Sequence, residues 1–436
     1  MSPRIHRTGP ARGVLRAGFC AGVLRAGAAR GILRGRARAL PGPARLYIQN
    51  MAYFDAASAE PIAPAAKFAL LEALHDGWAD PARLHREGRQ ARLLLDQARE
   101  QVAAIFGCRA DEVSFTGSGT QAAHLAVLGA VQARRSPARG QGHVVVSAVE
   151  HSSVLNAAAF AEDSGTAVTI AGVDSSGLVD VDAFTAAVGR DRTVLACLQS
   201  ANHEVGTIQP VPEVAAACQA AGVPLFVDAA ASAGRMPPPA GWSMLAASSH
   251  KFGGPPGVGV LAVRKAVRWK SPLPSDNREG WRVPGFPNLP AIIAAAVALE
   301  DADADRQAAD TALRGLTAQI RDQLPALVPD CVVHGDPVTR LPHIVTFSVL
   351  YLDGEALVIE LDRAGFAVSS GSACASDTEQ PSHVLAAMGA LTHGNVRVSL
   401  PRNTTEESVT AFLAAMPDIV SRLRGSVGRV EQREIW

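Results

Sequence analysis

The sequence lacks any uninterrupted apolar run of the roughly 18 residues that a membrane-spanning helix requires. It also has no two cysteines in the C-x-x-C spacing, and its six cysteines stand far apart in a chain of 436 residues. A chain of this length needs no disulfide staples, so this usage fits a reducing cytosol and disfavours a structural zinc site. These absences argue against an integral membrane protein and predict a cytoplasmic protein without a metal.

Net charge is absent as well, because 41 Lys and Arg balance 41 Asp and Glu. The balance argues against binding nucleic acid. It hides an asymmetry: residues 1–50 contain ten arginines and no acidic residue. A Gly-Val-Leu-Arg or Gly-Ile-Leu-Arg tetrapeptide recurs there every nine residues, which places successive arginines on opposite sides of a helix. We expect a disordered leader or a misassigned start upstream of Met51, with organelle targeting as the alternative.

Lysine is scarce, with four residues against 37 arginines. One of the four, Lys251, stands in the segment Ser248-Ser249-His250-Lys251-Phe252-Gly253-Gly254, whose small residues leave the amine accessible. A lysine retained in so arginine-rich a chain favours an amine that must lose its proton, which arginine cannot do. Lysine is the residue that pyridoxal-phosphate enzymes link to their cofactor. The alternative is an ordinary solvated surface charge.

From Tyr53 onwards, short apolar or β-branched runs alternate with Ala- and Leu-rich stretches. This alternation is typical of βαβ units around a mostly parallel sheet. Strands are predicted at 113–115, 143–147, 167–171, 193–198, 224–227 and 259–263, and helices at 90–106, 120–132, 211–221 and 289–321. Residues 270–290 read as an irregular loop. After about residue 305, strands at 344–349 and 367–369 and helices at 382–388 and 406–423 predict a smaller α/β unit.

Polar or small residues follow several of these predicted strands, where functional groups gather in open α/β sheets. The loop at 116–120 would offer backbone N–H groups to a phosphate, or it is an ordinary glycine-rich turn. Asp228 would pair with a protonated ring nitrogen, or it caps a helix. His151 would stack on a flat ring or transfer protons, or it is structural. Asn202 would reach a cofactor or substrate oxygen, or it serves turn chemistry.

This order of phosphate loop, His151, Asn202, Asp228 and Lys251, followed by Val368-Ser369-Ser370-Gly371-Ser372-Ala373-Cys374, resembles the cysteine desulfurases of the class V aminotransferase fold. The resemblance covers about residues 52–423. The cysteine segment is its most specific part and is similar to the subgroup with a longer cysteine loop. The segment Val396-Arg397-Val398-Ser399-Leu400 resembles the family segment whose arginine holds the substrate carboxylate through a two-pronged contact.

The resemblance implies an α/β protein of fold type I pyridoxal-phosphate (PLP) architecture. Its large domain would span 66–304, with a mostly parallel, mixed seven-stranded sheet between helices. A smaller α/β domain would comprise 51–65 and 305–436 and would carry the Cys374 loop. The implied protein is a cytoplasmic homodimer that contacts neither membrane nor nucleic acid.

The resemblance also implies the reaction, in which L-cysteine is converted to L-alanine. The sulfur passes to Cys374 as a persulfide for delivery to an acceptor protein, as in iron–sulfur cluster assembly. Lys251, Cys374 and His151 would be catalytic, and Asn202 and Arg397 would orient the substrate. The cofactor would be held by residues spread over these loops: Gly119, Thr120, His151, Asn202, Asp228, Ser248, His250 and Lys251.

Three sites depart from the family pattern, and at one of them Ser275-Asp276-Asn277 stands in place of a glycine-rich, histidine-containing run. Ala231 replaces a glutamine that would contact the phenolic oxygen of PLP, and Phe286 replaces a threonine that would reach the phosphate of the partner subunit. Each loss removes a hydrogen bond of about 1–3 kcal/mol. Two other functions therefore stay open. One is a selenocysteine lyase or another class V lyase or aminotransferase. The other is a degenerate, non-catalytic homologue that acts as a binding partner.

Overall fold

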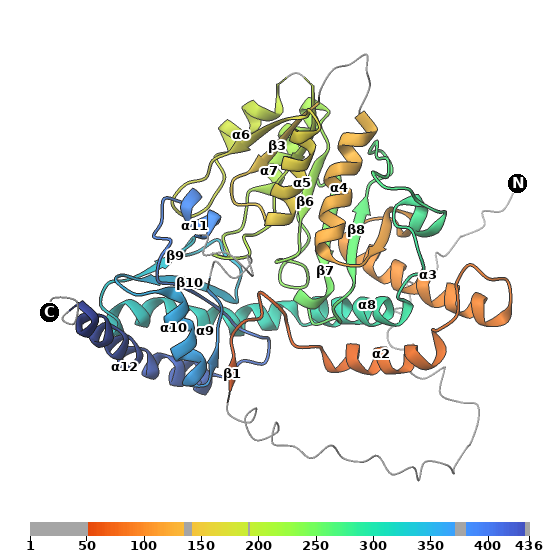
Figure 1. Ribbon diagram of the computed structural model, residues 1–436. Coiled ribbons are helices and arrows are strands. Elements are labelled where there is room, and N and C mark those ends of the chain that lie inside the picture. Colours follow the sequence, from red (N-terminus) through yellow and green to blue (C-terminus); the bar gives the residue numbers. More distant parts are fainter. Residues whose placement is uncertain (1–50, 135–141, 191, 371–380, 432–436) are drawn as a thin grey trace, which may run out of the picture. The chain divides into compact units, whose positions relative to one another are not determined.

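A sheet of seven strands, counted over the described residues, lies at the centre of the structure (Figure 1). Its order is β2-β8-β7-β6-β5-β3-β4. Strand β8 runs antiparallel to both of its neighbours, whereas all neighbouring pairs from β7 to β4 in this order are parallel. The predicted mostly parallel, mixed sheet is confirmed. The strands are β2 (Val113–Thr116), β3 (His143–Ser147), β4 (Ala167–Ala171), β5 (Thr193–Cys197), β6 (Leu225–Asp228), β7 (Met244–Ser248) and β8 (Gly259–Val263).

The computed structural model describes residues 51–134, 142–190, 192–370 and 381–431, with side chains as far as residue 425. The predicted leader and Cys374 lie outside the described residues. Asn50–Trp436 form one compact unit. The expected division into a large and a smaller domain therefore stays a prediction.

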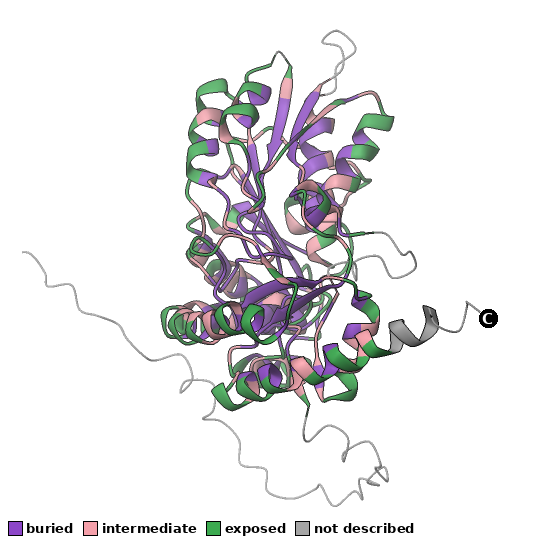
Figure 2. Ribbon diagram, turned by 90° about the vertical axis from the view of Figure 1, so that its left-hand side faces the viewer, coloured by how far each residue is buried: buried purple, intermediate pink, exposed green. Residues whose placement is uncertain are grey.

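Alternate residues of each central strand point to opposite faces of the sheet and enter two separate cores. Val144 and Val146 pack with α4 and α5, whereas Val145 packs with α3, α6, α7 and α8. Figure 2 shows the result, buried strands between helices whose outer sides are exposed. These helices are α3 (Arg86–Phe106), α4 (Gly119–Arg134), α5 (Ser152–Asp163), α6 (Val181–Val188), α7 (Val211–Ala221) and α8 (Leu289–Ala304), and α2 (Pro64–Asp76) packs on α8.

A second set of strands joins the beginning of the described chain to its C-terminal part. Strand β10 lies between β9 and β12 in an antiparallel sheet, and β1 pairs in parallel with β11. The rings of Phe54, Phe366 and Phe412 pack together with centroids 5.5–6.2 Å apart. The remaining elements are β1 (Ala52–Tyr53), β9 (Cys331–His334), β10 (Ile344–Val349), β11 (Phe366–Ala367), β12 (Asn395–Ser399), α9 (Arg306–Leu327), α10 (Gly354–Arg363), α11 (His383–Ala387) and α12 (Glu406–Glu431).

The single helix predicted over 289–321 is wrong, because two helices, α8 and α9, are separated at Asp305. Helix α8 is buried along most of its length in the core of the central sheet, whereas α9 directs Leu313 and Ile320 into the core around Phe54. The carbonyl of Asp305 starts the second helix by accepting the N–H of Ala309.

Strand β7 was not predicted, because its sequence Met-Leu-Ala-Ala-Ser has no β-branched residue. Its place between β6 and β8 buries all of its residues, and this packing outweighs weak local propensity. The expected irregular loop at 270–290 contains one short 3-10 turn, Arg278–Trp281. No helix in the described ranges is both long and apolar enough to cross a bilayer.

Candidate active site

The predicted phosphate loop connects β2 to the N-terminus of α4. The hydroxyl of Ser118 accepts the N–H of Gln121 at 3.0 Å and so caps the helix. The next residue, Gly119, lies against Ser248 so closely that a Cβ at position 119 would come within 2.8 Å of the Cβ of Ser248. Glycine is therefore required for the end of α4 to meet the end of β7. The N–H groups in the first turn of a helix have no acceptor within the helix, so this junction can bind an anion.

Lys251 lies in a tight turn that directly follows β7. The turn is a 3-10 helix, Ser249–Lys251, and its backbone is fixed from outside by the N–H of Glu60, which donates to the carbonyl of His250 at 2.8 Å. A Cβ at Gly254 would come 2.1 Å from the hydroxyl oxygen of Ser249, so a side chain there would disrupt the turn. The hydroxyl of Ser248 lies 3.2 Å from Nδ1 of His250. Ser248, His250 and Gly119 therefore meet at one place.

Asp228 and His151 both lie within the electrostatic reach of Lys251. Burial raises the pKa of Asp228, and a hydrogen bond from the N–H of Ala230 together with the Lys251 ammonium partly offset this rise. Burial, followed by the Lys251 charge, lowers the pKa of His151 to about 3. Nδ1 of His151 accepts the N–H of Ser153 at 3.1 Å, so the proton of the neutral ring is on Nε2. Asp228, the last residue of β6, and His151, which precedes α5, thus lie around the lysine.

The side chain of Asn202 is fully buried and forms the turn after β5. Its Oδ1 accepts the N–H groups of Glu204 and Val205, both at 2.8 Å, and its Nδ2 donates to the carbonyl of Val149 at 3.1 Å. The structure therefore supports the turn chemistry that was the alternative for this residue. One N–H of the amide remains beyond these bonds for a ligand.

Arg397, in the middle of β12, is buried beside this turn. Its Nη1 donates to the carbonyl of His203 at 3.1 Å, and its Nη2 donates to Oδ1 of Asp55 at 3.0 Å and to Oγ of Ser58 at 2.7 Å. The pairing with Asp55 joins residues 342 positions apart. This ion pair could not be expected from local sequence, because the two residues meet only where the chain after β1 lies beside β12.

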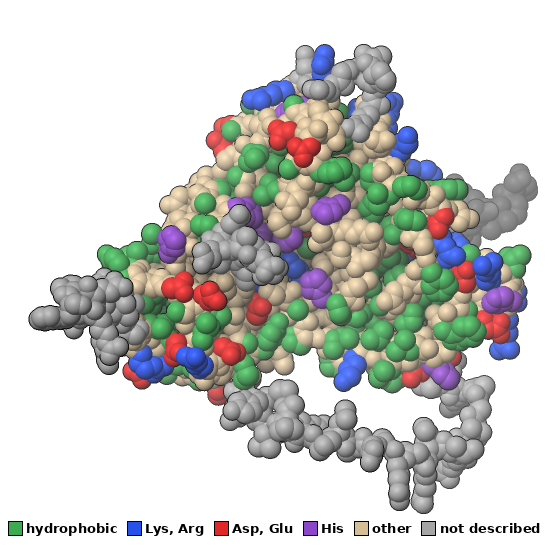
Figure 3. Space-filling view, in the orientation of Figure 1, with side chains coloured by type: hydrophobic (Ala, Val, Ile, Leu, Met, Phe, Trp, Pro, Cys, Tyr) green, Lys and Arg blue, Asp and Glu red, His purple; other side chains and the backbone are tan. Residues whose placement is uncertain are grey.

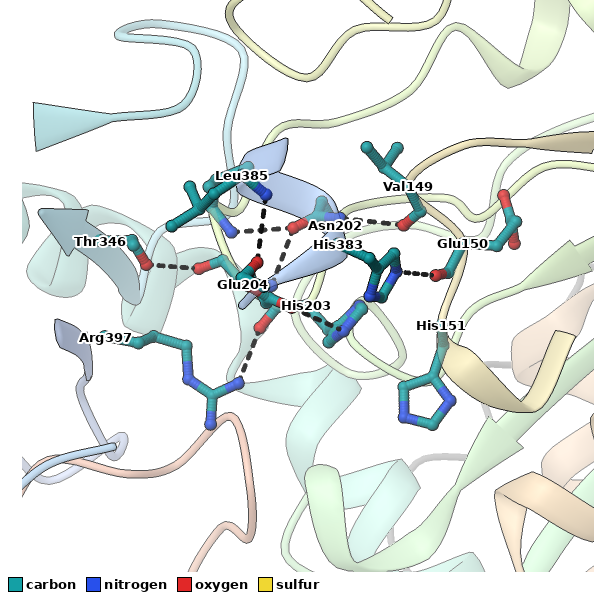
Figure 4. Close-up of polar contacts among 12 residues, drawn as sticks. Val149, Glu150, His151, Asn202, His203, Glu204, Thr346, His383, Leu385 and Arg397 are labelled. Atoms are coloured by element: carbon teal, nitrogen blue, oxygen red, sulfur yellow. Dashed lines mark hydrogen bonds and ion pairs between the residues drawn. The ribbon is translucent and has the colours of Figure 1, made fainter. Parts of the chain in front are cut away.

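Sequence reasoning assigned no role to the buried residues Glu150, His203 and Glu204 or to the half-buried His383, which surround the predicted ones. The ring of His203 lies 5.0 Å from that of His151 and 6.5 Å from that of His383, measured between centroids (Figure 4). Ser382 donates its hydroxyl to Glu204 at 2.6 Å, and Nε2 of His383 lies 2.9 Å from the carbonyl of Glu150. Histidine side chains gather at the middle of this face of the molecule (Figure 3).

Burial favours the neutral form of His151 and His203 and raises the pKa of the carboxyls of Glu150 and Glu204. The pKa of His203 is held well below its usual range, chiefly by burial and then by the neighbouring His151. Burial also raises the pKa of Glu204, and Ser382 partly opposes this through its hydrogen bond. Glu204, like Asn202, is a polar residue in the segment that follows the strand predicted at 193–198. This position is the signal that could have singled out Glu204.

Glu150 gives a testable pH dependence of stability. Burial raises its pKa from 4.5 to about 8, and Oε2 has no hydrogen-bond partner while Oε1 accepts the N–H of Gln199. Between these two pH values the unfolded chain loses a proton that the folded chain keeps, so this carboxyl destabilises the fold increasingly as pH rises. We expect the change in unfolding free energy caused by Glu150→Gln, relative to the wild-type protein, to be more stabilising at pH 8 than at pH 5 by on the order of 1–3 kcal/mol. Urea unfolding at the two pH values measures the difference.

The matched control is Glu213→Gln, on the exposed side of α7. This variant should shift the urea midpoint equally at both pH values, because its carboxyl is solvated in both states. Equal shifts for Glu150→Gln at pH 5 and pH 8 would contradict a carboxyl that is protonated in the folded protein.

The four cysteines in the described residues are free and have raised thiol pKa values. Burial raises the pKa to about 11 for Cys108 and to about 12 for Cys218 and Cys331, and Cys197 lies well above its usual range. None of these four therefore carries a thiolate near neutral pH. No group of His, Cys, Asp or Glu in the described part of the chain could hold a metal ion.

Ala231 and Phe286, at two of the sites that depart from the family pattern, have different surroundings. Ala231 packs against a small apolar cluster that includes Ala201 and Ile344. Phe286 is 58% exposed, and the guanidinium of Arg278 lies 5.6 Å from the centre of its ring. Neither residue offers a side-chain hydrogen-bond donor at its position.

Comparison with known proteins identifies the family. A model of the class V aminotransferases matches residues 52–412. A cysteine desulfurase from Nostoc sp. is 35% identical over 385 residues, which cover 86% of this chain and 94% of that protein. A solved NifS-like protein is 26% identical with a TM-score of 0.78, covering 86% of this chain and 100% of the other. SspA in complex with cysteine is also 26% identical, with a TM-score of 0.70 and coverage of 81% and 100%.

These relatives confirm the resemblance and the fold class inferred from the motifs. Three features point the same way: the phosphate loop, the lysine turn after β7 and the buried aspartate at the end of β6. The chain therefore belongs to the cysteine desulfurases of the class V aminotransferase family, which depends on PLP.

Proposed function

We propose that this chain converts L-cysteine to L-alanine and transfers the sulfur to Cys374 as a persulfide. The observation that carries the proposal is the meeting of Lys251, Asp228 and His151 near the carboxyl ends of β7, β6 and β3 of one sheet, in a chain of the cysteine desulfurase family. The complex of the related SspA with cysteine supports the choice of substrate.

The residues around Lys251 fit PLP in their chemistry. Gly119, Thr120, Ser248 and His250 would hold the phosphate, because the close contact of Gly119 with Ser248 brings helix N–H groups, hydroxyls and an imidazole together. Asp228 would pair with the ring nitrogen, and Lys251 would be bonded to the aldehyde carbon. When bound, PLP would supply the electron sink that stabilises negative charge on the α carbon of the substrate.

Four residues would handle protons and orient the substrate. Arg397 would hold the substrate carboxylate, and the free N–H of Asn202 would help to place the amino acid or the cofactor. Lys251 Nζ would move a proton at the α carbon. His151 is neutral near physiological pH, so its flat ring can stack over a cofactor while Nε2–H serves as a donor.

Sulfur transfer requires a thiolate, which we assign to Cys374. Its sulfur would attack the sulfur of cysteine, so that an S–S bond forms as the Cβ–S bond breaks. The electron pair of the broken bond stays on the carbon fragment, which takes up protons and leaves as alanine. The persulfide on Cys374 then passes to an acceptor protein, whose identity stays open, as does the cytoplasmic location expected from the resemblance.

The test is the stoichiometry of turnover by the purified protein. We expect alanine and sulfide in equal amounts from L-cysteine when a reductant releases the persulfide. Strong preference for L-selenocysteine over L-cysteine, with Cys374 dispensable, would instead indicate a selenocysteine lyase. A protein that binds no PLP even when PLP is in excess would contradict both activities and favour a non-catalytic binding partner.

A homodimer is proposed from the resemblance and supported by the outer face of α2. Phe68, Leu71 and Leu74 follow one another at helical spacing and are 65%, 58% and 58% exposed. Apolar side chains gather over α2 in the space-filling view (Figure 3). A contiguous exposed apolar face of this kind marks an interaction surface. Light scattering should give twice the 45.3 kDa mass of one chain, and a monomer at micromolar concentration would contradict the proposal.

A further inference from the structure

The guanidinium of Arg397 donates to three partners within the protein. Nη2 uses both of its hydrogens, one to Oδ1 of Asp55 and one to Oγ of Ser58, and Nη1 donates to the carbonyl of His203. Nε is buried and has no hydrogen-bond partner. The side chain of Arg397 is 5% exposed and that of Asp55 is 22% exposed, so solvent reaches the pair from the Asp55 side.

Because Nη2 has no free hydrogen, neither edge of the guanidinium that includes Nη2 can bind a carboxylate through two hydrogen bonds. A carboxylate binds a guanidinium with two parallel hydrogen bonds either along the Nε–Nη2 edge or along the Nη1–Nη2 edge. Both edges include Nη2, whose hydrogens go to Asp55 and Ser58. A second carboxylate can therefore bind in the two-pronged manner only by displacing one of these partners from Nη2.

Asp55 is held firmly in this position by the segment that joins β1 to α2. The phenol of Tyr53 donates to the carbonyls of Asp55 and Ala59, at 3.0 and 2.7 Å. Oγ of Ser58 donates to Oδ1 of Asp55 at 3.0 Å, and Asp55 forms a parallel bridge with Ser399 of β12. Because these contacts fix the backbone on both sides, Asp55 cannot leave Arg397 by a movement of a loose chain end.

We propose that Asp55 is a positioning residue that competes with the substrate carboxylate for Arg397 and thereby sets the KM for L-cysteine. The proposal rests on the proposed function, in which Arg397 binds that carboxylate. Asp55 neutralises the buried guanidinium, and an incoming carboxylate meets both a filled Nη2 and a negative charge beside it. An asparagine at position 55 keeps an oxygen that orients Arg397 and removes the charge that opposes the substrate.

The test is Asp55→Asn, measured by two readouts. We expect the KM for L-cysteine to fall about tenfold, with kcat changed by less than about twofold, because the effect is on substrate binding. The second readout is the Kd of 3-mercaptopropionate, which has the carboxylate and thiol of cysteine and no amine. Calorimetric titration of the purified protein should show this Kd falling by a similar factor.

Three further variants serve as a substitute for Asp55→Asn, a control for net charge and a test of Arg397. Asp55→Ser, which also removes the charge, should shift both constants in the same direction if Asp55→Asn does not fold. Asp310→Asn removes the partner of Arg314 on α9 and should leave both constants unchanged, which controls for net charge. Arg397→Met should weaken binding of 3-mercaptopropionate at least tenfold.

A KM and a Kd that are unchanged or raised in Asp55→Asn would overturn the proposal, because Asp55 would then only support Arg397. Unweakened binding of 3-mercaptopropionate by Arg397→Met would overturn it as well. If the wild-type protein does not turn over cysteine, the proposed function fails, but the two Kd comparisons still decide the role of Asp55.

Discussion

Replacing Lys251 with alanine should give a colourless protein that releases no measurable sulfide from L-cysteine. The turn after β7 places this amine within the electrostatic reach of Asp228 and His151. Among the four lysines of the chain, Lys67 and Lys265 are exposed, and neither lies near these groups. We therefore expect no other amine to replace Lys251, and a loss in kcat of at least about a thousandfold.

The measurements are the visible absorbance after incubation with excess PLP and the rate of alanine formation. Lys265→Ala is the matched control, because it removes a lysine whose backbone N–H, not its amine, contacts Glu112. This control should stay yellow and active. A Lys251→Ala protein that is yellow and turns over cysteine at the wild-type rate would refute the assignment of the lysine.

Replacing Cys374 with serine should separate the two halves of the reaction. We expect the variant to keep its yellow colour and to lose at least about a hundredfold in sulfide release, because no thiolate is available to attack the sulfur of cysteine. The other described cysteines cannot replace it, since burial raises each of their pKa values well above neutral pH.

Cys331→Ser is the control for this experiment. Cys331 lies on β9, and the pKa of its thiol is raised to about 12, so it carries no thiolate near neutral pH. After brief exposure of the wild-type protein to cysteine, mass spectrometry should detect one additional sulfur atom on the peptide that contains Cys374. Normal desulfuration by Cys374→Ser would show that the persulfide mechanism is wrong.

Much of the fold and of the proposed chemistry follows from local sequence. Strands β3, β4 and β8 and helix α7 lie at the predicted residues, because β-branched runs and alanine-rich stretches separated by glycine and proline have strong local preferences. Asp228 and His151 were singled out because they stand at or shortly after the end of an apolar run, and the carboxyl ends of parallel strands meet at one edge of the sheet. Lys251 was singled out by the scarcity of lysine and by the small residues around it.

Burial and long-range pairing, in contrast, were decided by the tertiary structure. The strand β7 exists because its neighbours bury it, and the two helices that meet at Asp305 contribute to different cores. Asn202 had two open interpretations until its side chain was seen to complete a turn. The sequence could not show this, because the geometry of a turn depends on the strands that enclose it.

The electrostatics of the site show the same division. The residue types that bind a carboxylate or a phosphate were visible in the sequence, but their partners were not. Arg397 meets Asp55 across 342 positions, and Glu150 has its raised pKa because the packed sheet and helices exclude water from it. Hydrogen-bond saturation and desolvation are properties of the folded surroundings, so only the packed chain could reveal which donors of Arg397 are taken and which carboxyls keep their protons.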